Sequence, residues 1–263
     1  MTDETRTIDL SVEVPGTPEE VWEAIATGPG ISSWFVTCGV DEEVGGSVSM
    51  DFGGVRQETG KVTVWEPPTR VVFEGPGGKD DGRVLAYEWL VEAREGGTCL
   101  VRLVNRGFGT GEEWDGDYDG LTQGWKVFLG NLRLHLTHFR GRHARALTPV
   151  AVAPGPNSAA WGALCSALGV SPTLEAGDRL TTSGEGVPPL TGVLQGARRS
   201  EAISEYRMLL DGPAAGTALV AAEGRGEQVA LSVWLYLYGD AAPGEGDWAA
   251  WLEDRFPATQ PES

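Results

Sequence analysis

The sequence predicts an α+β protein made of two related halves, each an antiparallel meander of short strands closed by a helix. In the first half, strand-like runs separated by Gly and Pro follow an initial strand and two short helices. One long stretch with apolar residues at spacings of three and four comes next, which indicates an amphipathic helix. The second half then repeats landmarks of the first at a constant distance along the chain.

The elements of the first half follow from local patterns. Residues 8–14 alternate apolar and polar side chains, as in a strand with one buried face. Thr17, followed by Pro18 and two acids, is typical of a helix start and predicts a helix over 17–26, with a second short helix around 31–35. Turn residues then delimit five further strands, at 45–52, 57–65, 70–74, 83–92 and 98–106. The long helix is expected over 121–140.

The second half reads as a shortened copy of the first. Landmarks 139 residues apart match: Pro15, Gly16, Trp22, Ala24 and Ile25 correspond to Pro154, Gly155, Trp161, Ala163 and Leu164. Strands are expected at 190–195, 202–211, 216–223 and 228–238, and a closing helix at 246–256. We therefore predict two domains, 1–143 and 144–263, joined between Gly141 and Val150 without a flexible linker.

Composition and charge exclude several classes of protein. Acidic residues outnumber basic ones by 38 to 20, and the net charge of −18 opposes binding to nucleic acid. No apolar run is long enough to insert into a membrane, and the N-terminus lacks the pattern of a signal peptide, so we expect a cytoplasmic protein. The three cysteines are far apart and form no metal-binding motif, so neither a metal nor another cofactor is expected.

Several motifs of the first half recur in the order and spacing of a known family. These are Ile8 through Trp22 to Trp34-Phe35, the run GKVTVWEPPTRVVF at 60–73, Gly97-Thr98 to Gly107-Phe108, and Gly124-Trp125 with Leu129 and Leu132. Over about residues 5–143 the chain resembles the domain family named for the activator of the heat-shock-chaperone ATPase (AHSA). That family lies within the START/birch-pollen-allergen-like SRPBCC superfamily. The second half is similar only through the internal repeat.

This resemblance implies a helix-grip fold, in which a curved antiparallel sheet wraps around a long C-terminal helix, often with an apolar cavity between them. The superfamily includes lipid and hormone binders, aromatase/cyclases and chaperone co-factors, so the fold leaves the function open.

Strand alternation predicts which side chains line such a cavity. If Leu10 and Val12 point inward, the same parity turns Val62 and Val64 inward. Extrapolation from Val62 also turns two polar side chains toward the cavity mouth, unless a bulge at Gly60 reverses them. The ligand-binding residues we predict are Phe52, Arg56, Glu58, Phe73, Tyr87, Trp89, Trp125 and Phe128. Each large apolar side chain among them has the alternative of simply filling the core.

Two further motifs suggest metals and are explained more simply. The run DGDYDG at 115–120 resembles the start of a calcium loop, but Lys126 stands where a bidentate Glu is required, so we interpret it as an acidic loop that caps the long helix. His135 and His138 are three residues apart on that helix without an accompanying carboxylate. Because Leu136 and Phe139 mark its buried side, we expect solvated histidines.

Three functions remain. The first is non-enzymatic binding of a small apolar or amphipathic ligand between the sheet and the long helix. The second is a co-chaperone-type interaction module, and the third is a cyclase or hydrolase using Arg56, Glu58 and Tyr87. The strand at 228–238 is apolar on both faces, so each face must be covered by another part of the protein. We predict that the second domain's own helix covers one face and that the first domain or a second copy of the chain covers the other.

Overall fold

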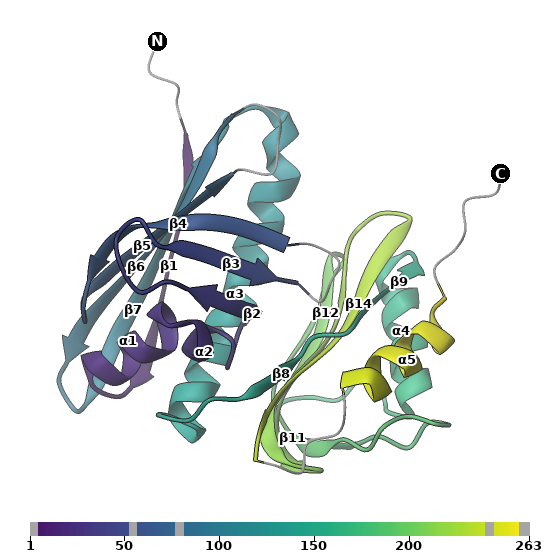
Figure 1. The fold of residues 1–263 in the computed structure, drawn as a ribbon. Helices are drawn as coiled ribbons and strands as arrows, with labels where there is room; N and C mark the ends of the chain where they lie inside the picture. The colour runs from purple at the N-terminus through teal and green to yellow at the C-terminus, as the bar shows by residue number, and fades with distance from the viewer. Residues whose placement is uncertain (1–4, 53–56, 77–81, 240–244, 258–263) are drawn as a thin grey trace. The chain divides into compact units, whose positions relative to one another are not determined.

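The chain folds into two compact units, residues 1–143 and 144–263. The computed structural model describes residues 5–52, 57–76, 82–239 and 245–257 (Figure 1). Within these ranges no helix is both long and apolar enough to span a bilayer.

The first unit is one antiparallel sheet with three α-helices and one short 3-10 helix, Glu112–Trp114, before the last of them. In chain order its elements are β1 (Arg6–Pro15), α1 (Pro18–Ala26), α2 (Gly28–Ile31), β2 (Thr37–Val40), β3 (Ser47–Asp51), β4 (Gln57–Glu66), β5 (Arg70–Pro76), β6 (Val84–Arg94), β7 (Thr98–Phe108) and α3 (Asp115–His138). The strands lie in the order β1-β7-β6-β5-β4-β3-β2. The helices α1 and α2 therefore connect β1 at one edge of the sheet to β2 at the opposite edge. The aromatic side chains of α3 pack against those of the sheet, which is the helix-grip arrangement.

The two short helices are fixed by their caps. Thr17 and Glu20 form a capping box at the start of α1, with Pro18 at the first helical position. Thr27 ends α1, and its hydroxyl accepts a hydrogen bond from the backbone N–H of Gly30 at 3.1 Å. This second cap starts α2 at Gly28 rather than near residue 31, so the second helix lies about three residues earlier than the sequence pattern predicts.

The inward face of the sheet follows the predicted alternation except at one bulge. Val62 is fully buried and pairs with Phe73, but the pairing of β4 with β5 shifts between Val62 and Val64. The extra residue reverses the parity, so Val64 pairs with Val72 on the outer face. The prediction that Val64 points inward is therefore wrong.

The long helix begins earlier than expected. Residues 115–120 form the first turns of α3, so the interpretation of this run as an acidic loop is wrong. Tertiary contacts hold these turns: Arg6 forms an ion pair with Asp115, and the Tyr118 hydroxyl donates to the Thr7 carbonyl at 3.0 Å. The Tyr118 ring also packs edge-on against Phe108, at 5.4 Å between centroids. Such contacts outweigh the weak helix propensity of a Gly- and Asp-rich segment.

The second unit repeats this topology in shorter form. Its elements are β8 (Arg145–Leu147), β9 (Val150–Pro154), α4 (Asn157–Leu168), β10 (Arg179–Thr181), β11 (Thr191–Arg199), β12 (Ile203–Gly212), β13 (Ala215–Glu223), β14 (Gln228–Tyr238) and α5 (Glu245–Arg255). The strands lie in the order β10-β11-β12-β13-β14, with β8 and β9 both beside β14. Arg6–Pro15 and Arg145–Pro154 are separated by the same 139 residues as the sequence landmarks, which confirms the tandem repeat.

The second unit has its own core and its own buried polar anchor. Trp161, Tyr206 and Trp248 pack in one cluster with the apolar side chains of β12–β14. The Asn157 side chain donates to the carbonyls of Ala202 and Ala222 at 3.1 and 2.8 Å. These bonds tie the start of α4 to the sheet.

Both faces of β14 are buried, as the sequence predicts. Leu235 and Leu237 belong to the core cluster, whereas Trp234 and Tyr236 lie on the opposite face and are buried there.

Candidate functional site

A small cavity lies inside the first unit, between the inner face of the sheet and α3. Its volume is about 10 Å³, which is about the space for the centre of one water molecule. The helices α1, α2 and α3, the segment after α2, and strands β3, β5 and β6 all contribute to its walls. The lining residues are Ile25, Ile31, Trp34, Phe35, Met50, Phe73, Tyr87, Trp89 and Trp125.

Aromatic rings form most of the wall, and Trp125 of α3 is at their centre. Its ring centroid lies 5.0 Å from that of Phe35, 5.6 Å from that of Trp89 and 5.9 Å from that of Tyr87. Phe35 also packs edge-on against Phe128, with centroids 4.5 Å apart. Edge-to-face contacts of this kind are attractive, so the cluster holds the cavity walls together without filling the space completely.

Most of the predicted ligand-binding residues meet at this cluster. Phe73, Tyr87, Trp89 and Trp125 line the cavity. Phe52 and Phe128 each contact the ring of Phe35 and extend the cluster to half-exposed positions. Arg56 lies outside the described residues.

Glu58 lies at the edge of this site. It pairs with Met50 across β3 and β4, and residues that pair directly in a sheet share a face. Glu58 is half-buried on the inner face beside a lining residue. The bulge that reverses β4 comes after Val62, so Glu58 keeps the parity of Val62.

Three important residues were not among the predicted ligand-binding residues. Trp34 and Phe35 line the cavity from the turn after α2, and the indole N–H of Trp34 donates to the Ala24 carbonyl at 2.8 Å. Asn105 is the third: it follows the buried Val101 and Leu103 at the same parity in β7, so strand alternation places it on the inner face with them.

Two buried polar groups in this interior have no hydrogen-bond partner among the described residues. The side chain of Asn105 is fully buried, and neither its oxygen nor its nitrogen is bonded. The indole N–H of Trp125 is likewise buried and unbonded. Burying a polar group without a hydrogen bond costs about 1–3 kcal/mol, so Asn105 destabilises the first unit unless something binds it.

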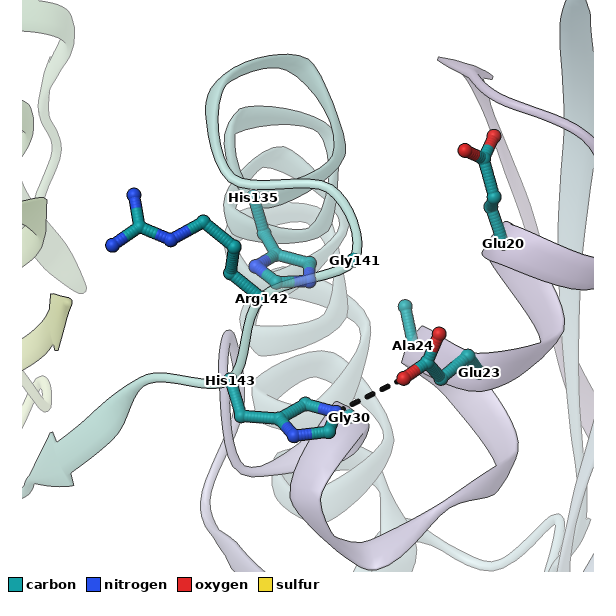
Figure 2. A pocket seen from close by; sticks show the side chains of 8 residues that line it. All are labelled: Glu20, Glu23, Ala24, Gly30, His135, Gly141, Arg142 and His143. Carbon is teal, nitrogen blue, oxygen red and sulfur yellow. Dashed lines mark hydrogen bonds and ion pairs between the residues drawn. The ribbon is translucent and has the colours of Figure 1, made fainter.

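A second small pocket lies between α1, α2 and the end of α3 (Figure 2). His143 is paired with Glu23 at 3.1 Å, and nearby Arg140 with Glu20 at 3.3 Å, which ties the chain after α3 to α1. His135, also in this wall, is only 3% exposed, so the prediction of a solvated histidine is wrong for this position. Its burial, together with the nearby His143, lowers the pKa of His135 to about 4, so the ring is neutral at pH 7.

The sequence placed His135 wrongly because α1 and α2 cover a flank of α3 beside the stripe marked by Leu136 and Phe139. His138 is exposed, as predicted, and His143 is exposed as well. In the part of the chain that the structure describes, no group of three or more His, Cys, Asp or Glu side chains is placed to hold a metal ion.

The cysteines are poor nucleophiles. Burial raises the pKa of Cys38 and of Cys165 to about 12, and it also raises the pKa of Cys99. All three are therefore protonated thiols near neutral pH, whereas nucleophilic attack requires a thiolate.

Comparison with known proteins identifies the family. Residues 5–147, more than half of the chain, match the family described as "Polyketide cyclase / dehydrase and lipid transport", and the chain belongs to this family. The family lies within the SRPBCC superfamily. No match was found among curated proteins.

Solved structures with similar folds cover either the whole chain or its first half. DynU16, described as a putative protein in the dynemicin biosynthetic locus, is 18% identical and aligns over 95% of this chain and 93% of its own, with a TM-score of 0.46. The di-domain ARO/CYC BexL from the BE-7585A biosynthetic pathway is 13% identical over 97% of this chain and all of its own, with a TM-score of 0.46. The Aha1 dimer from Colwellia psychrerythraea is 23% identical over 52% of this chain and 99% of its own, with a TM-score of 0.43.

Proposed function

We propose that the first unit binds a small apolar or amphipathic ligand between its sheet and α3, without catalysing a reaction on it. The aromatic wall around the cavity is the observation that supports this proposal most strongly. It joins three helices and three strands around one space, and Phe52 and Phe128 extend it to half-exposed positions. Ligand sites are typically concave and apolar with few polar groups, and this interior has that character.

The size of the cavity sets a condition on binding. At about 10 Å³ it holds no molecule larger than water, so a ligand enters only if aromatic side chains rotate away. The half-exposed Phe52 and Phe128 are the side chains best placed to do so, because one side of each already faces solvent. The closed cavity is then the resting state of a site that opens as the ligand binds.

The lining also supports a binding role over a catalytic one. Among the described residues that line the cavity, Tyr87 alone has an ionisable side chain. Acid–base catalysis of the kind that the family's name suggests requires a second group beside it. Among the described residues, Glu58 is the candidate for that second group, because it lies on the same inner face of the sheet. The alternative that this geometry favours is a cyclase-type reaction through Tyr87 and Glu58.

The small cavity volume favours another alternative, a co-chaperone-type interaction module that uses the surface of the fold instead of its interior. A pull-down from cell extract that recovers a chaperone, together with stimulation of that chaperone's ATPase, is the result that would favour this alternative. If the chaperone is absent and its ATPase is unaffected, this alternative is wrong.

Ligand binding is tested on the full chain with a variant that blocks the cavity. We expect native mass spectrometry of freshly purified protein to show a bound small molecule, or a panel of fatty acids, sterols and aromatic polyketides to raise the melting temperature. Met50→Trp puts a large ring into the cavity wall and is expected to abolish both signals. Val84→Trp adds the same ring at a position that is 52% exposed and serves as the control. No bound mass and no thermal shift in the unaltered protein would refute the proposal.

A further inference from the structure

We propose that the amide of Asn105 is the polar anchor of this site, and that the ligand is a neutral, flat molecule carrying a hydrogen-bond donor next to an acceptor. The inference rests on the proposed ligand-binding function and names the chemistry of the ligand. Asn105 lies on the inner face of β7, between Ile8 of β1 and Tyr87 of β6.

Asn105 is next to the cavity wall. It pairs directly with Tyr87, a lining residue, and the Cβ atoms of such a pair are about 4.5–5.5 Å apart. The Tyr87 ring in turn contacts Trp125, whose buried indole N–H is also unbonded. Movement of the Tyr87 side chain, which is half-exposed, would bring the Asn105 amide into contact with whatever occupies the cavity.

The two unbonded atoms of Asn105 define what the ligand must offer. A carboxamide is satisfied by a partner that accepts from its NH₂ group and donates to its oxygen, such as another amide or a hydroxyl beside a carbonyl. An apolar chain leaves both atoms unsatisfied. A carboxylate accepts but cannot donate, so it satisfies only one of them.

Charge and shape restrict the ligand further. Glu58 lies on the inner face at the half-exposed edge of the site, and an acidic side chain there makes this edge less favourable for an anion. The protein's net charge of −18 acts in the same direction. Because the wall consists mainly of aromatic rings, a flat ring system makes the largest contact area with it.

The test compares naphthalene probes of one shape and different polarity on the full-length protein. The probes are 2-naphthamide, which carries donor and acceptor, 2-ethylnaphthalene, which carries neither, and 2-naphthoate, which is an anion. We expect isothermal titration calorimetry to show at least tenfold tighter binding of 2-naphthamide than of the other two. Asn105→Leu is expected to remove this preference, since it keeps the side-chain size and loses both polar atoms. Asn105→Ser tests the same point if the Leu variant does not fold.

Asn131→Leu is the matched control. Asn131 is another buried amide with no partner among the described residues, but it lies six residues after Trp125 on α3. At about 100° per residue it is rotated about 120° away from Trp125 around the helix, so it faces away from the cavity wall. Its substitution is expected to keep the preference for 2-naphthamide.

The outcomes separate the two proposals. Equal binding of 2-naphthamide and 2-ethylnaphthalene, or a preference that survives in Asn105→Leu, overturns the anchor role while ligand binding stands. Failure of every probe to bind the unaltered protein overturns the anchor role; ligand binding itself falls only if, in addition, no bound mass and no thermal shift are found.

Discussion

Replacing Asn105 by Leu is expected to stabilise the protein, which is unusual for a fully buried position. The Asn105 side chain has neither of its polar atoms bonded within the described chain, and an uncompensated amide costs about 1–3 kcal/mol. Leucine has nearly the same size and removes this cost. We therefore expect the free energy of unfolding to rise by about 2 kcal/mol. With a urea m-value of about 2 kcal/mol/M, the unfolding midpoint rises by about 1 M.

Asn157 provides the opposite control in the second unit. It is also buried, but its amide donates to the carbonyls of Ala202 and Ala222 and its oxygen accepts from the Ser204 hydroxyl at 2.8 Å. Asn157→Leu leaves these partners unsatisfied and is expected to lower the free energy of unfolding by about 2–4 kcal/mol. The two substitutions are chemically identical, so the difference in sign isolates the effect of hydrogen bonding.

The assay must report the two units separately, because a chain with two units need not unfold in one step. Urea-dependent hydrogen exchange followed by mass spectrometry does so, with peptides from β6 and β7 for the first unit and peptides from β12 and β13 for the second. If Asn105→Leu lowers the stability of β6 and β7 as much as Asn157→Leu lowers that of β12 and β13, the Asn105 amide is bonded in the free protein. That result would refute the proposed role of Asn105 as an anchor for a ligand.

Two further predictions concern charge. The pKa of His135 is about 4 in the folded protein and about 6.5 in the unfolded chain. As the pH drops from 7 toward 4, the unfolded chain is protonated before the folded protein, so the free energy of unfolding falls. In urea titrations we expect the free energy of unfolding to fall by about 2 kcal/mol between pH 7.5 and pH 5, and this fall to be absent in His135→Gln. An equal fall in both proteins would contradict this explanation. On the outer face, Glu88 is 5% exposed and forms ion pairs with Arg70 at 2.8 Å and with Arg106 at 2.6 Å. Because both arginines reach solvent, Glu88→Ala is expected to lower the free energy of unfolding by only about 1 kcal/mol. A decrease above 3 kcal/mol in urea unfolding would show that these ion pairs behave as buried ones.

Sequence patterns predicted the order of elements because each is encoded locally. The cap at Thr17 and the apolar stripe on α3 each act within a few residues, and the repeat at 139 residues carries the same signals into the second unit. Where tertiary contacts decide, the patterns failed. The first turns of α3 depend on Arg6 of β1, which is 109 positions before its partner Asp115, and on the packing of Tyr118 against Phe108 at the end of β7. No local pattern contains the contact with Arg6.

The candidate site was predicted in part for the same reason. Alternation placed Phe73, Tyr87 and Trp89 on the inner face, and the structure brings them to one cavity with Trp125. Asn105 is polar, so the pattern of large apolar side chains does not include it, although its parity in β7 is that of Leu103. The bulge after Val62 was beyond prediction, since an extra residue in one strand is visible only in its pairing with the next.

Both units leave some buried polar atoms without a hydrogen bond among the described residues, but the position of Asn105 beside the cavity supports the proposal that the first unit binds the ligand. In the second unit, Asn157 bonds the sheet, and the hydroxyl of Tyr206 donates to the Ser171 carbonyl at 2.9 Å and accepts from the Leu174 N–H at 2.9 Å. These side chains stabilise their own fold. Trp248 leaves its indole N–H unbonded as Trp125 does, so an unbonded indole alone does not distinguish the units. The amide of Asn105 carries more weight, because its donor and its acceptor both lack partners beside the aromatic cavity.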